Sequence, residues 1–184
     1  MKPGVAILLL SLTPAWCQLA KPAALTPSNL PAPRAARIPL DAIRELERTF
    51  NDRLSRLAGV DQPAELMWDT RGVQLEDYGV VFTTEVSLVI TPGLMPGRPT
   101  IPLEMAARVK VQRVARMPLL KAAMMTMMDS MAAAFTQIPR SQQLVLVVRL
   151  YYGAWEDTTG MPAQVIMRAS REAVAAAKVE TEER

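Results

Sequence analysis

The chain has 184 residues, of which 50% are hydrophobic and 21% are charged, and its formal net charge is +3. It contains no histidine and a single cysteine, Cys17. This composition excludes histidine-based catalytic triads, histidine-ligated metals, disulfides within one chain and cysteine-rich zinc sites. The excess of 21 cations over 18 anions is too small to indicate nucleic-acid binding. We therefore expect no metal and no cofactor.

Residues 1–20 have the pattern of a secretory signal peptide. Lys2 is followed by the short apolar run Val5 to Leu12, and small residues suited to a signal peptidase occur at Ala15 and Cys17. The run is shorter than the roughly 20 apolar residues that span a bilayer. A lipid anchor on Cys17 is disfavoured because the bulky Trp16 precedes it. We expect an exported protein, periplasmic or extracellular.

Residues 21–37 are rich in proline and alanine and show neither a helical nor a strand period, which predicts an extended linker. Residues 38–180 are then expected to form one domain. Its first helix is predicted from about Leu40 to Ala58, because apolar side chains recur at intervals of three and four residues and Gly59 follows.

The middle of the domain has the pattern of short strands. Asp69–Gly72 and Asp157–Gly160 share a turn pattern that predicts two hairpins, the first joining residues 66–68 to 73–75. Tyr78-Gly79 predicts a further turn into a strand from Val80 to Ile90, with one apolar and one mixed face. The following segment, 91–102, is rich in proline and glycine and is our candidate binding loop. Its candidate contact residues are Gly93, Leu94, Met95, Gly97 and Arg98.

A second, long helix is predicted from Pro102 to Phe135. Pro118 lies inside it and is expected to kink or split it. The first half carries most of the cations, and the second half is rich in methionine and alanine. Residues from both halves form the candidate partner surface: Met124, Met127, Met128, Met131, Arg108, Arg113 and Arg116. The four methionines share one helical face, which fits core packing, contact with a partner, or binding of Cu(I) by thioethers.

The last part of the chain predicts two strands and a helix. Leu144 to Tyr152 is almost wholly apolar, as in a central strand, and residues 164–167 are its expected hairpin partner. Ser170 is a suitable cap for a helix at residues 171–178, which a charged and frayed tail would follow. The fold class is therefore predicted to be α+β, a two-layer sandwich in which an antiparallel sheet packs against the two long helices.

The only plausible catalytic groups are carboxylates. Glu76-Asp77 and Glu156-Asp157 are each expected in turns, and Glu85 is expected to pair with Arg149 across the sheet. Because catalytic residue types are scarce, our main hypothesis is a non-catalytic interaction or assembly protein of a bacterial cell envelope. It would bind a protein partner or a second copy of itself, with no nucleic acid and no transmembrane segment, although contact with a membrane surface stays open. The alternatives are a small carboxylate-dependent hydrolase or lyase and a methionine-based Cu(I) protein.

Overall fold

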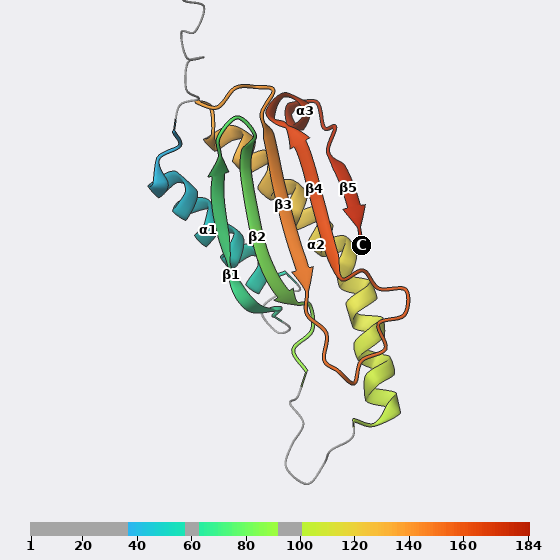
Figure 1. Ribbon diagram of the computed structural model, residues 1–184. Helices are drawn as coiled ribbons and strands as arrows, with labels where there is room; N and C mark the ends of the chain where they lie inside the picture. Colours follow the sequence, from blue (N-terminus) through green and yellow to red (C-terminus); the bar gives the residue numbers. More distant parts are fainter. Residues whose placement is uncertain (1–36, 58–62, 92–100) are drawn as a thin grey trace, which may run out of the picture. The chain divides into compact units, whose positions relative to one another are not determined.

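The structure is a computed structural model that describes residues 37–57, 63–91 and 101–184, all of which belong to one unit, Ala35–Arg184. The expected leader and nearly all of the expected linker lie outside the described residues, as does most of the candidate loop. The elements in chain order are α1 (Leu40–Ser55), β1 (Glu65–Leu75), β2 (Gly79–Ser87), α2 (Leu103–Ala134), β3 (Gln143–Leu150), β4 (Gln164–Ser170), α3 (Arg171–Ala175) and β5 (Glu180–Glu183). This is an α+β fold, as predicted (Figure 1).

The five described strands form one sheet in the order β1-β2-β3-β4-β5. Strands β1 and β2, β3 and β4, and β4 and β5 pair antiparallel, but β2 and β3 pair parallel, with Val80 opposite Leu144 and Val86 opposite Leu150. The prediction of an antiparallel sheet was therefore wrong for its central pair. The physical reason is α2, because a long crossover helix returns the chain to the start of the sheet and makes the next strand parallel.

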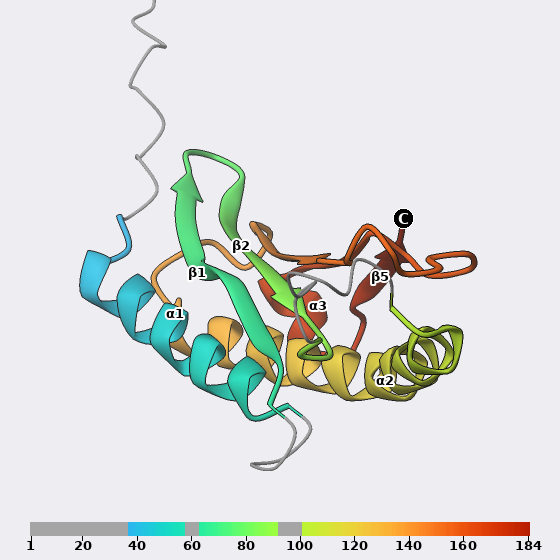
Figure 2. The ribbon, with the colours of Figure 1, turned by 90° about the horizontal axis from the view of Figure 1, so that it is seen from below.

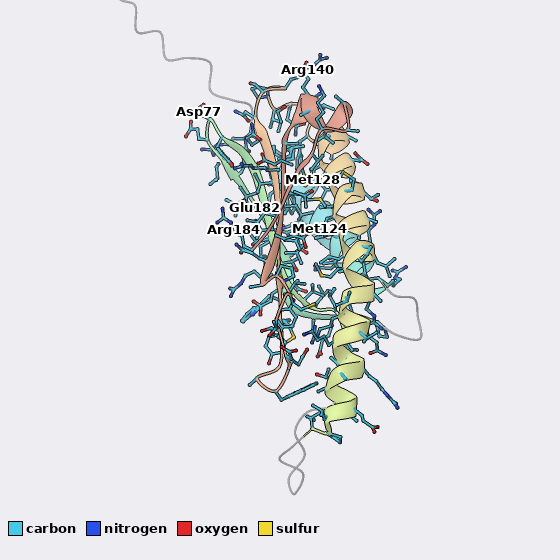
Figure 3. The ribbon with its side chains drawn as sticks, turned by 90° about the vertical axis from the view of Figure 1, so that its right-hand side faces the viewer. Asp77, Met124, Met128, Arg140, Glu182 and Arg184 are labelled. Carbon is cyan, nitrogen blue, oxygen red and sulfur yellow. The ribbon has the colours of Figure 1, made fainter. Side chains whose placement is uncertain are left out.

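Helices α1 and α2 lie on the same side of the sheet, as Figure 2 shows. Their buried side chains meet those of the strands in one apolar core, with Phe82 of β2 stacked 6.1 Å from Phe135 at the end of α2. The methionines of α2 point into this layer, and Figure 3 shows Met124 and Met128 between the helix and the sheet. No described helix covers the opposite face of the sheet, and we call this face the open face.

Helix α1 also protects the free edge of β1. The backbone N–H of Gly72 donates to Oε1 of Glu47 at 2.7 Å, and that of Thr70 donates to Oδ1 of Asn51 at 2.9 Å. An unpaired edge strand can template the addition of another chain. Because these side chains occupy the donors that such a chain would need, α1 blocks addition at this edge.

Replacing both Glu47 and Asn51 with alanine is expected to lower the free energy of unfolding by about 1–3 kcal/mol, since three hydrogen bonds are lost, one of them from Asn51 to Asp69. It should also speed aggregation on mild heating, because the edge of β1 becomes available. Urea unfolding and light scattering measure the two effects. The matched control is Glu45→Ala, on an exposed position of the same helix. Equal aggregation of the double variant and this control would contradict the protective role.

The region predicted as the first hairpin is a continuous strand. Strand β1 runs through Asp69–Gly72, with shifts of register between Leu66 and Trp68 and between Trp68 and Arg71. The prediction was wrong because the local turn pattern competes with α1, which supplies partners for the backbone of residues 70 and 72. The real turn follows at Glu76–Tyr78, in front of β2, as Tyr78-Gly79 indicated.

The charged tail is also ordered, contrary to prediction. Residues 180–183 form β5 and pair with β4, and Arg168 of β4 donates to both carboxylate oxygens of Glu180 at 2.9 Å. Glu183 accepts from Lys121 of α2 at 2.5 Å. The acids that suggested a frayed tail are thus matched by cations of the sheet and helix.

Helix α2 is a single helix, and Pro118 does not split it. Proline removes the hydrogen bond to the carbonyl of Val114, four residues earlier. Both residues are exposed, so water can bind that carbonyl. Three further predictions for the C-terminal half are confirmed: β3 is the central strand, β4 is its antiparallel partner, and the Ser170 hydroxyl caps α3 by accepting from the N–H of Ala173 at 3.1 Å. Helix α3 is shorter than predicted, because it ends at Ala175 and not at residue 178.

Candidate functional site

A buried ion pair joins the N-terminal half of α2 to the loop between β3 and β4. Nε and Nη2 of Arg113 donate to the two carboxylate oxygens of Glu156, at 2.5 and 2.7 Å. The side chains are only 2% and 4% exposed. Two parallel charge-assisted hydrogen bonds fix both the distance and the orientation of the pair. The ion pair therefore sets where this loop lies against the helix.

The loop itself is built around the same carboxylate. The N–H of Gly153 donates to Oε1 of Glu156 at 2.8 Å, and the N–H of Glu156 donates back to the Gly153 carbonyl at 2.9 Å. The guanidinium carbon of Arg113 lies 5.0 Å from the centre of the Tyr152 ring, a cation–π contact. Burial raises the pKa of Tyr152, whose hydroxyl donates to the Pro162 carbonyl at 2.7 Å.

Two further contacts fix α2 to the end of β2. Nη2 of Arg113 donates to the Ser87 hydroxyl at 3.2 Å, and Nη1 of Arg116 donates to the carbonyl of Leu88. Burial, and then the charge of Arg113, lower the pKa of Arg116. Of the three α2 cations that were candidates for a partner surface, Arg113 and Arg116 therefore face the sheet.

An exposed ion pair lies beside the buried one. Lys110 of α2 donates to Oδ2 of Asp157 at 2.5 Å, and this hydrogen bond is the main reason that the pKa of Asp157 lies well below its ordinary value. We name the contacts of Arg113, Arg116 and Lys110 with residues 87–88 and 156–157 the α2 clamp. Its groups donate to and accept from one another, except that the buried Nη1 of Arg113 has no hydrogen-bond partner in the part of the chain that the structure describes. The clamp therefore holds the helix in place.

The side of α2 that faces away from the clamp is apolar and exposed. We name this surface the α2 stripe, and its residues are Leu103, Ala107, Val111, Val114, Pro118 and Ala122. They recur at three or four residues and so lie on one side of the helix. The N-terminal half of α2, with most of the stripe, runs past the core of the sheet beside the β3–β4 loop (Figures 1 and 3).

The open face of the sheet carries a second exposed surface. A hollow of about 620 Å³ lies over β1, β2 and β3, with Trp68, Asp69 and Arg71 on one side and Glu85 and Arg149 on the other. Trp68 is 71% exposed. The predicted pair of Glu85 and Arg149 is present, with 3.8 Å between Oε2 and Nη1. Arg71 has no ion-pair partner among the described residues.

The structure separates the residues that were predicted to form one partner surface. The four methionines are fully buried in the core, and Arg113 and Arg116 are buried in the α2 clamp. They are therefore not available as a surface of this chain. Only Arg108 is exposed. The candidate loop residues Gly93, Leu94, Met95, Gly97 and Arg98 lie outside the described residues.

The two acidic pairs lie at opposite ends of the sheet. Glu76-Asp77 is in the turn before β2, and Glu156-Asp157 follows β3, which runs parallel to β2. Figure 3 places Asp77 at the end of the sheet away from the N-terminal half of α2. Because the two pairs are at opposite ends of the sheet, these four carboxylates do not line a common cleft. Both oxygens of Glu156 also accept hydrogen bonds from Arg113.

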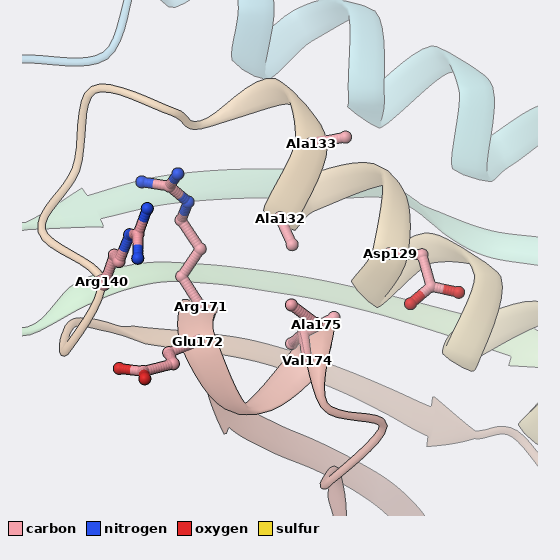
Figure 4. Close-up of a pocket in the computed structure, with 8 residues that line it drawn as sticks. All are labelled: Asp129, Ala132, Ala133, Arg140, Arg171, Glu172, Val174 and Ala175. Carbon is pink, nitrogen blue, oxygen red and sulfur yellow. The ribbon is translucent and has the colours of Figure 1, made fainter.

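A further hollow, of about 460 Å³, lies between the C-terminal end of α2 and α3 (Figure 4). Arg140 and Arg171 form one wall, and Asp129 lies at the other end. Arg171 donates to the carbonyls of Thr136 and Ile138, at 2.8 and 2.9 Å. The arginine therefore closes the turn after α2, and the hollow is a consequence of that packing.

Within the described ranges, no three histidine, cysteine, aspartate or glutamate residues are grouped so that they could hold a metal ion. None of the helices there has the length and apolar character needed to cross a membrane.

No family model, no curated protein and no solved structure matches this chain. The site must therefore be interpreted from its own geometry.

The sequence contained partial signals for the features it did not predict. Val111 and Val114 lie between cations in the first half of α2, and the scatter of those cations around the helix indicated that they did not form one polar face. Trp68 directly precedes the turn pattern at Asp69, which predicted a hairpin and not the continuous strand on which Trp68 is exposed. No local signal indicated that Glu156 pairs with Arg113, 43 residues away.

Proposed function

We propose that this chain is an exported, non-catalytic interaction protein of a bacterial cell envelope, which binds a protein partner on the open face of its sheet. The observation that carries the proposal is the hollow over β1–β3, in which an exposed tryptophan lies beside an arginine without an ion-pair partner among the described residues. Tryptophan, tyrosine and arginine are the residues that most often dominate the energy of protein–protein binding. Tyr151 adds a second exposed aromatic side chain just beyond β3.

The chemistry of the hollow indicates what its partner should present. Trp68 and the alkyl part of Arg71 favour an apolar side chain, and the guanidinium of Arg71 favours a carboxylate next to it. Arg149 already faces Glu85, so it contributes less to the attraction. The expected partner is therefore a protein surface on which an acidic residue neighbours an apolar one.

Site-specific photo-crosslinking of the full chain in its own cells tests this function. A benzoylphenylalanine at position 68 should give a covalent adduct with one envelope protein, and Arg71→Glu should remove the adduct, because the partner's carboxylate is then repelled. The same photo-reactive residue at the exposed position Leu40 of α1 is the control and should give no such adduct. Absence of an adduct at position 68, or its persistence with Arg71→Glu, would contradict the proposal.

Cell fractionation tests the export that the proposal includes. The N-terminal pattern predicts a chain outside the cytoplasm that lacks residues 1–17 or 1–20. Full-length chain recovered from the cytoplasm would contradict this part of the proposal without affecting the hollow.

A further inference from the structure

The α2 stripe has a spacing that reads the same in both directions. Its six residues are separated by four, four, three, four and four positions. A helix surface with this symmetry is complementary to itself when a second copy packs antiparallel. Val111 of one copy then lies opposite Val114 of the other, and Ala107 lies opposite Pro118. Such a contact is isologous, which is the kind that forms a closed twofold dimer.

Charge distinguishes the antiparallel arrangement from a parallel one. Glu104 and Lys121 are equally distant from the centre of the stripe, so antiparallel pairing brings Glu104 of each copy to the level of Lys121 of the other. Parallel pairing would instead place like charges at the same level, which is unfavourable. Lys121 also donates to Glu183 of its own chain.

The shape of the stripe also fits a close helix pair. Its outer positions alternate large and small side chains, with Leu103 opposite Ala122 of the other copy. Small residues allow two helix axes to approach to about 8 Å. The α2 clamp holds the opposite side of the helix against the sheet and the β3–β4 loop, so the stripe is presented without prior ordering of α2. Preorganisation of this kind reduces the entropy that binding must overcome.

From this symmetry, charge pattern and exposure, we propose that the α2 stripe binds the α2 stripe of a second copy, antiparallel, in a homodimer. The inference concerns a different surface from the hollow on the sheet and does not depend on the partner proposed for it. One dimer would therefore present two such hollows.

The first test is the mass of the full chain in solution as a function of concentration, measured by sedimentation equilibrium. The mass should rise from that of one chain toward twice that value. Val114→Asp should abolish the rise, whereas Val73→Asp on the open sheet face should not. The two valines are matched, because each is 53% exposed. Circular dichroism and urea unfolding confirm that both variants fold.

The second test determines the orientation of the pair. In a Cys17→Ser background, chains with Val111→Cys and differently tagged chains with Val114→Cys are mixed under mild oxidation. Antiparallel pairing should link unlike chains, so that the mixture gives far more disulfide dimer than either variant alone. A monomer at all concentrations, a dimer that survives Val114→Asp, or preferential linkage of like chains would each overturn the proposal.

Discussion

Replacement of Glu156 by alanine is expected to lower the free energy of unfolding by about 3–5 kcal/mol, because it leaves a buried charge without its partner. The Arg113 side chain is only 2% exposed, so water cannot replace the carboxylate. The same change removes the acceptor for the Gly153 N–H, and with it the bond that closes the loop after β3. Urea denaturation followed by circular dichroism measures the loss.

Two variants make this prediction specific. Asp157→Asn removes the neighbouring acid, which is exposed and paired with Lys110, and should cost far less stability than Glu156→Ala. The double variant Arg113→Met, Glu156→Leu removes both charges and keeps similar volumes, so it should recover much of the stability lost in Glu156→Ala. Equal destabilisation by Glu156→Ala and Asp157→Asn would show that the buried pair does not hold the loop.

The elements with strong periodicity could be predicted from the sequence. Both long helices and the central strand occur close to the predicted positions. The first helix has a clear helical period, whereas the central strand was indicated by a short, nearly all-apolar run rich in β-branched residues. Met124 and the other buried methionines lie on the same side of α2 as Leu120, and the structure confirms that they pack in the core. Pro118 does not split α2, and its ring lies on an exposed side of the helix.

The features that depend on distant partners could not be predicted. Strand β1 passes through a turn-like sequence because Glu47 and Asn51 of α1 bind its backbone, and β5 forms because Arg168 and Lys121 neutralise its acids. The parallel pairing of β2 and β3 likewise depends on α2, which connects the end of β2 to the start of β3 as a crossover helix. In each case a contact between elements prevails over a local preference.

The same reason explains why the candidate site was located incorrectly. A count of cations along α2 does not show which of them face the sheet. Arg113 and Arg116 can be buried because Glu156, Ser87 and the Leu88 carbonyl accept hydrogen bonds from them. Removal of these cations from the surface leaves the valines between them exposed, and this exposure produces the α2 stripe.

Replacement of Gly79 by alanine is expected to destabilise the fold by roughly 3–5 kcal/mol. Gly79 begins β2 at a φ of 139°, in a region that side chains disfavour. A Cβ at this position would lie 1.9 Å from the backbone oxygen of Gln143, at the start of β3. Because that atom belongs to the backbone, the parallel pair of strands would have to move apart where it begins.

Gly160 provides the matched control, because its φ is also positive, at 77°, but no other atom lies within 4 Å of a Cβ placed there. Gly160→Ala should therefore cost only about 1 kcal/mol, the strain of the left-handed backbone alone. Urea unfolding of the two variants separates the cost of a positive φ, which both share, from the cost of the contact between a Cβ at residue 79 and the Gln143 backbone. If both lose the same stability, the close approach of β2 and β3 at Gly79 is not what requires glycine. If only Gly79→Ala unfolds readily, the central parallel pair depends on the missing side chain.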